Sequence, residues 1–404
     1  MNEPRLRFKA DDGSEFPDWE DGRLGELCSY RRGSFPQPYG AEEWYDEKNG
    51  KPFIQVADVG DNMKLLPDTK RHISKAAMPM SVFVDAGTLI VTLQGSIGRI
   101  AITDYDAYID RTLLIIQNIN SILKKEFLQY ALFVLFADEK KRADGGTIKT
   151  ITKETLTNFT FEFPCLAEQQ KIAEFLSTVD TVIEKQKETV SAWEERKKGV
   201  MQKLFSQELR FKADDGSDFP EWEEKKIGDL FYKVNERNNG QFGKDKWISV
   251  AKMYYQDEDK VTSNNIDTRT YVMRVGDMSF EGHPNKEFKY GRFVVNDIGD
   301  GIISELFPIY RHKENYILKY WKYAIQVDSI MQKIYRKSIT SSGASSNKLD
   351  DDDFKRQSIS VPCLEEQQKI ADCLSSLDEV IEKQKATLAA WEALKKGLLQ
   401  QMFV

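Results

Sequence analysis

The sequence predicts a mixed α/β protein in which two globular regions are joined by two long helices that form an antiparallel coiled coil. Three observations support this fold: a long helical segment that occurs twice, a short segment that occurs twice, and a common order of strands and helices between them. The length of 404 residues favours two to three domains.

The longer repeat covers residues 164–206 and 362–404, at an offset of 198 residues, and 27 of the 43 aligned positions are identical. In each copy, apolar residues recur at alternating steps of four and three, which is the pattern of a coiled-coil helix. At 1.5 Å per residue, a helix over residues 167–205 would be about 58 Å long. Such a helix cannot bury its apolar stripe alone, so we expect the two copies to pack on each other.

The predicted seam is formed by the same positions in both copies. Its main residues are Ile172, Leu176, Val179, Ile183 and Trp193 in the first copy, and Ile370, Leu374, Leu377, Ile381 and Trp391 in the second. Gln186 and Lys197 interrupt the first seam, and Gln384 and Lys395 interrupt the second at matching positions. Polar residues inside a seam weaken packing but penalise wrong registers. Two unrelated surface helices are the alternative, which the matching seams disfavour.

The shorter repeat is a strap of similar sequence, Leu6–Glu20 and Leu209–Glu223, at an offset of 203 residues. We therefore divide the chain into a first strap (1–20), a variable region (21–163), a long helix (164–206), a second strap (207–223), a variable region (224–361) and a second long helix (362–404). The first helix leads the chain to the second variable region, and the second helix must return if the two helices pair. This order predicts an antiparallel pair, an approximate two-fold axis, and a first strap that lies beside Val404.

The two variable regions differ in residues but share a plan. The first has strand signals at 52–56, 87–92 and 99–103, a helix at 124–142 and a closing strand at 159–163; the second has strands at 276–280 and 292–295, a helix at 316–337 and a closing strand at 358–361. Both are therefore predicted to be mixed α/β domains. Asp350–Asp353 is interpreted as the start of a helix, because the run lacks the spacing and glycine of a calcium loop.

Composition excludes several classes of protein. The apolar fraction is 40%, the mean hydropathy is −0.54, and no apolar run approaches 18 residues, so we expect no membrane span. The N-terminus lacks the apolar core of a signal peptide. Cys28, Cys165, Cys363 and Cys373 show no paired spacing, so we interpret them as reduced thiols of a cytoplasmic protein without a metal site. A net charge of −7 argues against indiscriminate coating of nucleic acid but leaves room for a local basic face.

The chain lacks the motifs that mark several common catalytic and cofactor sites. The sequence contains no phosphate-binding GxxxxGK[ST] loop, no GxGxxG after a strand, no HExxH and no GxSxG. An enzyme is therefore the weaker class of function.

The whole chain resembles the specificity (S) subunits of Type I restriction-modification systems. The residues that carry the resemblance are Pro164 with Glu168–Ala173 and Pro362 with Glu366–Ala371, followed by Asp180 and Ile183 and by Asp378 and Ile381. The straps, each with a Trp-Glu pair and a following Leu/Ile-Gly-Glu/Asp-Leu segment, are also typical of the family. One such motif would be weak, whereas two copies at the family's spacing are specific.

The resemblance implies that this chain performs no chemistry and has no cofactor of its own. Each variable region would be a target-recognition domain that reads one half of a divided, asymmetric sequence in double-stranded DNA. The paired helices would set the gap between the half-sites and dock two modification (M) subunits, which carry S-adenosylmethionine and methylate adenine. Restriction (R) subunits, two at most, would add translocation and cleavage that depend on ATP and Mg²⁺.

Base reading needs polar side chains on exposed loops. The residues that we expect to contact DNA are Arg31, Arg32, Gln94, Ser96, Arg142, Thr147 and Lys149 in the first region, and Asn238, Asn239, Lys252, His283, Asn285, Lys286, Arg336, Ser341 and Asn347 in the second. For each of them, a solvated surface position is the alternative. Trp193 and Trp391 are more consistent with seam packing than with stacking on bases.

Two other hypotheses remain open on the sequence. A coiled-coil scaffold could join two protein partners without contacting DNA, and it would show no DNA binding at any salt concentration. A self-contained nuclease or methyltransferase is disfavoured because its motifs are missing.

Overall fold

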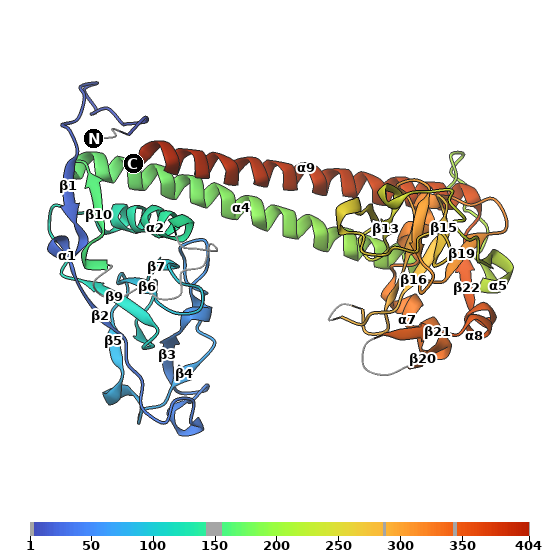
Figure 1. The fold of residues 1–404 in the computed structure, drawn as a ribbon, viewed down its shortest axis with the longest axis horizontal. Helices are drawn as coiled ribbons and strands as arrows, with labels where there is room; N and C mark the ends of the chain where they lie inside the picture. Colours follow the sequence, from blue (N-terminus) through green and yellow to red (C-terminus); the bar gives the residue numbers. More distant parts are fainter. Residues whose placement is uncertain (1–3, 143–155, 286–287, 342–345, 404) are drawn as a thin grey trace. The chain divides into compact units, whose positions relative to one another are not determined.

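The computed structural model describes residues 4–142, 156–285, 288–341 and 346–403. The chain divides into two compact units: unit 1 comprises Met1–Glu188 and Ala386–Val404, and unit 2 comprises Thr189–Lys385. The two long helices are α4 (Leu166–Phe205) and α9 (Leu364–Met402), close to the predicted ranges. Each helix gives one half to each unit, and each unit contains one of the predicted variable regions (Figure 1).

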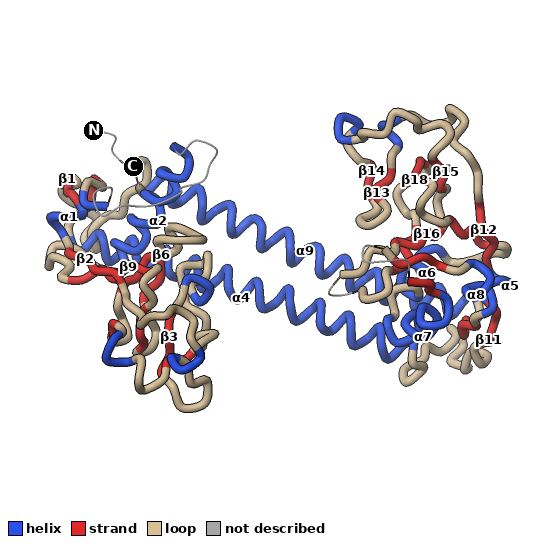
Figure 2. Tube along the Cα trace, turned by 60° about the horizontal axis from the view of Figure 1, so that its bottom comes forward, coloured by secondary structure: helices blue, strands red, loops and turns tan. Residues whose placement is uncertain are grey.

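Within each unit, the halves of α4 and α9 lie side by side and run in opposite directions (Figures 1 and 2). In unit 1, Lys187 Nζ lies 3.0 Å from Glu392 Oε1, and Lys395 Nζ lies 2.5 Å from Asp180 Oδ1. Residue numbers on α9 fall from 395 to 392 as their partners on α4 rise from 180 to 187, so the two helices are antiparallel. Unit 2 has the repeat mates of both contacts, Lys385–Glu194 at 2.9 Å and Lys197–Asp378 at 2.5 Å.

The central sheet of unit 1 has four antiparallel strands in the order β2-β9-β6-β7. These strands are β2 (Ser29–Arg32), β9 (Leu113–Gln117), β6 (Leu89–Thr92) and β7 (Ile100–Ile102). A second sheet has the order β4-β3-β8-β5, with strands β4 (His72–Ile73), β3 (Lys51–Ile54), β8 (Ala107–Ile109) and β5 (Val82–Val84). Helix α2 (Lys125–Arg142) packs on the central sheet, where its Phe127, Leu128 and Leu132 are fully buried.

Unit 2 repeats the central sheet of unit 1 with strands in the order β12-β19-β16-β17. These strands are β12 (Phe231–Val234), β19 (Ile309–His312), β16 (Met278–Glu281) and β17 (Arg292–Val295). Three two-stranded sheets are added: β13 (Ile248–Ser249) with β14 (Tyr254–Tyr255), β15 (Thr270–Met273) with β18 (Gly301–Ser304), and β20 (Ile339–Ser341) with β21 (Asn347–Leu349). The common plan of the two variable regions is thus confirmed at the level of the central sheet.

The single helix predicted at 316–337 is wrong. The structure has two helices there, α6 (Leu318–Ala324) and α7 (Asp328–Ser338). Val327 is extended, with φ −73° and ψ 100°, and its carbonyl accepts hydrogen bonds from the N–H groups of Ile330 and Met331. A second helix therefore begins at this point, which an apolar pattern continuing through the break does not reveal.

The acidic run is a helix start, as predicted. Helix α8 covers Asp351–Arg356, and the N-cap Asp350 accepts a hydrogen bond from the N–H of Asp353 at 2.8 Å. Carboxylates in the first turn are also favoured by the positive end of the helix dipole.

The predicted seam is buried most deeply where each long helix begins. Ile172 and Leu176 join the core of unit 1, together with Leu399 and Met402 from the end of α9. The seam residues exposed by no more than 6% are Ile172, Leu176, Val179, Ile183, Ile370, Leu374 and Ile381. Leu377, Trp193 and Trp391 are only partly buried. The first turns of each helix are therefore part of a domain core as well as of the coiled coil.

Each strap contacts the start of a long helix, through Arg7 with Glu168 in unit 1 and through Arg210 with Glu366 in unit 2. Each strap then leads into a short strand. In unit 1, the N–H of Leu6 donates to the carbonyl of Gln401 at 3.1 Å, so the first strap lies beside the C-terminal end as predicted. The strap continues into β1 (Glu20–Arg23), which pairs with β10 (Thr160–Phe163), and then into the short helix α1 (Leu24–Leu27). In unit 2, β11 (Glu223–Lys226), β22 (Ser358–Val361) and α5 (Ile227–Leu230) repeat this arrangement.

Among the residues that the structure describes, no helix has the length and apolar character needed to cross a membrane. The four cysteines are free thiols.

Candidate nucleic-acid interface

In unit 1, four of the predicted contact residues are exposed. Arg31 and Arg32 lie on β2, paired with β9, and Gln94 and Ser96 lie in the turn between β6 and β7. The turn is held against α2, because a Cβ added to Gly98, which has φ +76°, would lie 3.0 Å from the Phe136 side chain. The backbone of this turn is therefore fixed, while its polar side chains face solvent.

The structure does not test five of the predicted contact residues. Thr147, Lys149 and Lys286 lie outside the described residues, and the side chains of Arg142 and Ser341 are not described, although Arg142 ends α2 and Ser341 ends β20. For these residues the predictions stay predictions.

In unit 2, the structure brings two predicted segments together. The N–H of Asn347, on β21, donates to the carbonyl of Gly282, in the loop after β16, at 2.8 Å. Gly282 permits this approach, since a Cβ there would lie 2.1 Å from the carbonyl oxygen of Asn347. His283 and Asn285 are exposed in the same loop. Residues far apart in the sequence thus form one surface next to the β20–β21 hairpin.

The loop after β16 has internal support. His283 Nδ1 lies 2.6 Å from Oε1 of Glu281, whose side chain is 7% exposed, and Asn285 Oδ1 accepts from the N–H of Phe288 at 2.8 Å. Lys252 and Arg336 are also exposed. Lys252 follows Ala251, whose carbonyl accepts from Arg292 of β17, so it too lies near the strand that ends this loop.

The prediction that Asn238 contacts DNA is corrected by its burial. Its exposed fraction is 0%, its Oδ1 accepts from the N–H of Phe242 at 2.9 Å, and its Nδ2 donates to the carbonyls of Phe242 and Ile266. The hydrogen bonds of this side chain therefore close its own loop, and the side chain does not face solvent. The neighbouring Asn239 is exposed and has φ 45°, so its side chain faces solvent.

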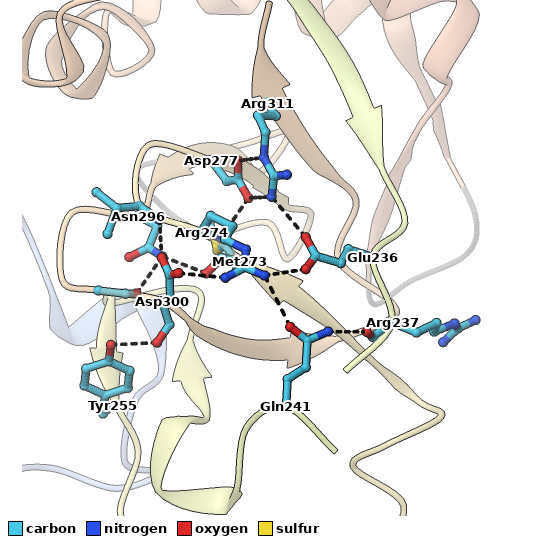
Figure 3. A network of polar contacts seen from close by, with 12 residues as sticks. Glu236, Arg237, Gln241, Tyr255, Met273, Arg274, Asp277, Asn296, Asp300 and Arg311 are labelled. Atoms are coloured by element: carbon cyan, nitrogen blue, oxygen red, sulfur yellow. Dashed lines mark hydrogen bonds and ion pairs between the residues drawn. The ribbon is translucent and has the colours of Figure 1, made fainter. Parts of the chain in front are cut away.

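A network of charged side chains holds the same loop in place (Figure 3). Arg311 forms two hydrogen bonds with the buried Asp277, at 2.7 and 2.8 Å. Arg274 contacts Glu236 at 2.5 Å, Asp300 at 2.9 Å and Gln241 Oε1 at 3.3 Å. These contacts join β19 and the turn between β15 and β16, which contains Arg274 and Asp277, to the loop that starts at Glu236.

Electrostatics in this network favour the charged states. The hydrogen bond from Arg274 lowers the pKa of Glu236, although partial burial opposes the shift. The hydrogen bond to Asp277 raises the pKa of Arg311 against its own desolvation. Glu236 and Arg311 therefore remain charged over the ordinary pH range, and both arginines of the network are already paired rather than free to contact a ligand.

Each unit also has a three-residue link between its domain and both long helices. In unit 1, Asp180 of α4 accepts from the Tyr130 hydroxyl of α2 at 2.8 Å and pairs with Lys395 of α9 at 2.5 Å. In unit 2, Asp378 accepts from Tyr323 at 2.6 Å and pairs with Lys197 at 2.5 Å. Burial, with the nearby carboxylate as a second cause, raises the pKa of both tyrosines.

Sequence reasoning missed the pairing of each strap with a buried glutamate. Arg7 contacts Glu168 through two nitrogens, at 3.2 and 2.7 Å, and Arg210 contacts Glu366 at 3.1 and 2.9 Å. The glutamate side chains are 0% and 1% exposed. The available signal was that the arginines and the glutamates are identical in both copies of their repeats. No cluster of side chains in the described ranges could hold a metal ion.

This chain matches a family model and is similar to several known proteins. The model of the "Type I restriction modification DNA specificity domain" matches residues 17–191 and, a second time, residues 220–390. The chain is 23% identical over 421 residues to the type I restriction enzyme MjaVIII specificity subunit of Methanocaldococcus jannaschii, covering 97% of this chain and 94% of that protein. It is 25% identical over 252 residues to the MjaIX specificity subunit of the same organism, covering 57% and 56%.

Two solved structures have the same fold over nearly the whole chain. One is the S subunit of a type I restriction-modification system from M. genitalium, with a TM-score of 0.54, 15% identity and coverage of 100% of this chain and 99% of that one. The other comes from a study of complex assembly and conformational transition of the type I R-M system, with a TM-score of 0.58, 15% identity and coverage of 96% and 98%.

Proposed function

This chain belongs to the type I restriction modification DNA specificity family, and from that membership we propose that each of its units reads one half of a divided DNA target. The chain is a DNA-recognition subunit of a type I restriction-modification complex, in which other subunits carry the catalysis. The observation that carries the proposal is that the family match occurs twice, once largely in each unit. A scaffold that never contacts DNA is not favoured by this family assignment.

The two half-sites would differ in sequence. Both units use the same central sheet, but the turn between β6 and β7 is short, whereas the corresponding β16 and β17 are separated by the longer segment 282–291. Because different side chains at different loop lengths meet different base edges, the target would not be palindromic.

The proposed contact residues are the exposed members of the predicted set. In unit 1 they are Arg31, Arg32, Gln94 and Ser96, and in unit 2 they are Asn239, Lys252, His283, Asn285 and Arg336. Asn347, which is partly buried, is added because its backbone lies against the loop of His283. Arginine and lysine would contact phosphates or guanine, and asparagine and glutamine would recognise adenine. Arg142, Thr147, Lys149, Lys286 and Ser341 remain candidates on their sequence positions.

The long helices would determine the gap between half-sites and dock two modification subunits. The support is that α4 and α9 contribute to both units and are linked to each domain through Asp180 and Asp378. S-adenosylmethionine would be bound by the modification subunits, and ATP and Mg²⁺ by up to two restriction subunits. The complex would act on DNA in the cytoplasm.

Methylation mapping tests the function directly. The chain would be expressed with its modification subunit in a host without other methyltransferases, and methylated adenines would be mapped across the genome. The expected result is a single asymmetric motif with a fixed unspecified gap. Exchanging residues 21–163 for the corresponding region of another family member should change one half of the motif only. Methylation without sequence preference, or an exchange that changes both halves, would contradict the proposal.

A binding experiment separates recognition from methylation. In an electrophoretic shift assay with the modification subunit present, a duplex containing the mapped motif should bind more tightly than one with a substituted half-site. The affinity should fall steeply with salt, since phosphate contacts release counterions.

A further inference from the structure

A buried amide oxygen at the start of α9 has no partner in the described parts of the chain. Gln367 is 5% exposed, and its Nε2 donates to the carbonyl of Pro362 at 2.9 Å. That carbonyl can only accept, so the amide cannot be turned around. Its Oε1 is left without a hydrogen bond, and a buried acceptor in this condition is strongly biased toward any donor that reaches it.

The repeat mate of Gln367 is fully used. Gln169 Nε2 donates to the carbonyls of Pro164 at 2.7 Å and Ile122 at 2.8 Å, and its Oε1 accepts from the N–H of Lys124 at 2.7 Å. The two latter contacts come from the segment that leads into α2. In unit 1 the backbone thus provides every hydrogen-bond partner of this amide, whereas in unit 2 the amide oxygen lacks one.

The backbones of the two units follow the same path up to Asn120 in unit 1 and Lys313 in unit 2, and differ after these residues. The N–H of Asn120 donates to the carbonyl of Leu27 at 2.8 Å, and the N–H of Lys313 donates to the carbonyl of the corresponding Leu230 at 2.9 Å. From Lys313 onward the chain of unit 2 turns differently, and the ring of Tyr316 stacks on His312, with 3.8 Å between ring centroids. The result is a pocket of about 490 Å³ that Gln367 lines.

The lining of this pocket combines aromatic rings with carboxylates. His312, Tyr316 and Trp321 provide rings, and Glu221, Glu223 and Glu314 provide negative charge. Lys225 also lines the pocket and lies 3.2 Å from Glu223, and Arg210, outside the lining, lies 3.3 Å from Glu221. The lining therefore carries three carboxylates and one ammonium group, an excess of negative charge. The Glu221 and Glu223 side chains are 91% and 73% exposed, so this charge lies on the solvent side of the pocket.

We propose that this pocket of unit 2 receives an arginine side chain of the modification subunit. A guanidinium group offers N–H donors to Gln367 Oε1, a positive charge to the glutamates and a flat face that stacks on the partly buried ring of Tyr316. A lysine would supply the charge without the planar donor array. The partner named here rests on the proposed function, in which modification subunits bind this chain.

The difference between the two units would affect assembly. Because Gln169 is already satisfied, the corresponding place in unit 1 offers no such acceptor, and two copies of one modification subunit would be held unequally. The copy bound at unit 2 would have an additional contact.

Charge reversal tests the pocket. The double variant Glu223→Lys/Glu314→Lys and the control Glu20→Lys, which alters the repeat mate of Glu223, would be titrated with the purified modification subunit, with native mass spectrometry to separate one-copy and two-copy complexes. The double variant should weaken one binding step at least tenfold, and the control should change neither step more than twofold. Thermal unfolding of each variant verifies the fold.

A second experiment identifies the occupant. A photo-crosslinking residue at Leu364, which lines the pocket and is 40% exposed, should capture a peptide of the modification subunit that contains an arginine, and substitution of that arginine by alanine should abolish the additional affinity. Capture of DNA or of a restriction subunit at this position would overturn the proposal. If the wild-type chain binds no modification subunit, the proposed function fails; if it binds and the double variant binds equally well, the pocket assignment alone fails.

Discussion

Lys395 of α9 lies 2.5 Å from Asp180 of α4, and both side chains are 15% exposed. Lys395 occupies a position that interrupts the apolar seam, and its repeat mate Lys197 makes the same contact with Asp378 at the same distance. A polar residue in a seam thus has a specific partner on the opposite helix. Any other register of the two helices would leave both charges without that partner, so the pairs select one register.

We predict that Lys395→Met destabilises the protein by about 2 kcal/mol, between the values for exposed and buried ion pairs, because Asp180 would remain as a poorly solvated charge. The free energy of unfolding would be measured in urea. Lys187→Met, whose partner Glu392 is half exposed, is the matched control and should cost about 0–1 kcal/mol. Equal effects of the two substitutions would show that Lys395 has no special role.

The strap of unit 1 should depend on Arg7. Substitution Arg7→Ala leaves the fully buried Glu168 unpaired, and we expect a loss of about 3 kcal/mol. Arg7→Lys should recover little of it, since a single ammonium cannot replace two guanidinium contacts. Limited proteolysis within residues 4–20 and urea unfolding would measure the effect.

A double-mutant cycle provides the control for this pair. Glu168→Gln combined with Arg7→Ala should cost less than the sum of the single substitutions, because the uncompensated charge is then absent. Strict additivity would contradict direct coupling between the strap and α4.

Asn238 and Asn239 should separate stability from recognition. Asn238→Ala removes the hydrogen bonds that close the loop and is expected to destabilise unit 2 by about 2 kcal/mol. Asn239→Gly removes an exposed side chain at a positive φ that glycine adopts readily, so it should leave stability nearly unchanged and weaken binding to the cognate half-site. Unfolding and electrophoretic shifts would be measured on both variants. A loss of DNA binding without loss of stability in Asn238→Ala would contradict the structural role given to it.

His312 should make stability depend on pH. Burial lowers its pKa from 6.5 to about 3, so below pH 6.5 the unfolded chain binds a proton that the folded chain does not. Stability is therefore complete above pH 6.5 and declines as the pH falls toward 3. At pH 5 the free energy of unfolding should be lower than at pH 7.5 by about 1–2 kcal/mol from this histidine. His312→Phe should reduce the difference in unfolding free energy between pH 7.5 and pH 5, and an unchanged difference would contradict the assignment.

Much of the fold could be predicted because repeats and apolar periodicity are local properties of a sequence. The heptad pattern placed both helices to within a few residues, and the order of the repeats required an antiparallel pair, since a chain that leaves one domain along a helix must return along the next. The break between α6 and α7 could not be predicted, because apolar residues continue through Val327.

The candidate site was predictable only in part. Exposed loop residues such as Gln94 and Asn239 could be selected by chemistry and turn position. Asn238 has the same chemistry as its neighbour, and only the surrounding backbone determines that one side chain is buried and the other exposed.

By itself, the sequence determined that this protein has two related halves, two paired helices and loops of different length on a common domain plan. The tertiary structure alone decided which charges pair, because Arg7 and Glu168, or Asp180 and Lys395, are more than 150 residues apart. It also decided that Gln169 is satisfied while Gln367 is open. Identical residues acquire different roles when the neighbouring backbone differs, since a hydrogen bond depends on the position of both partners.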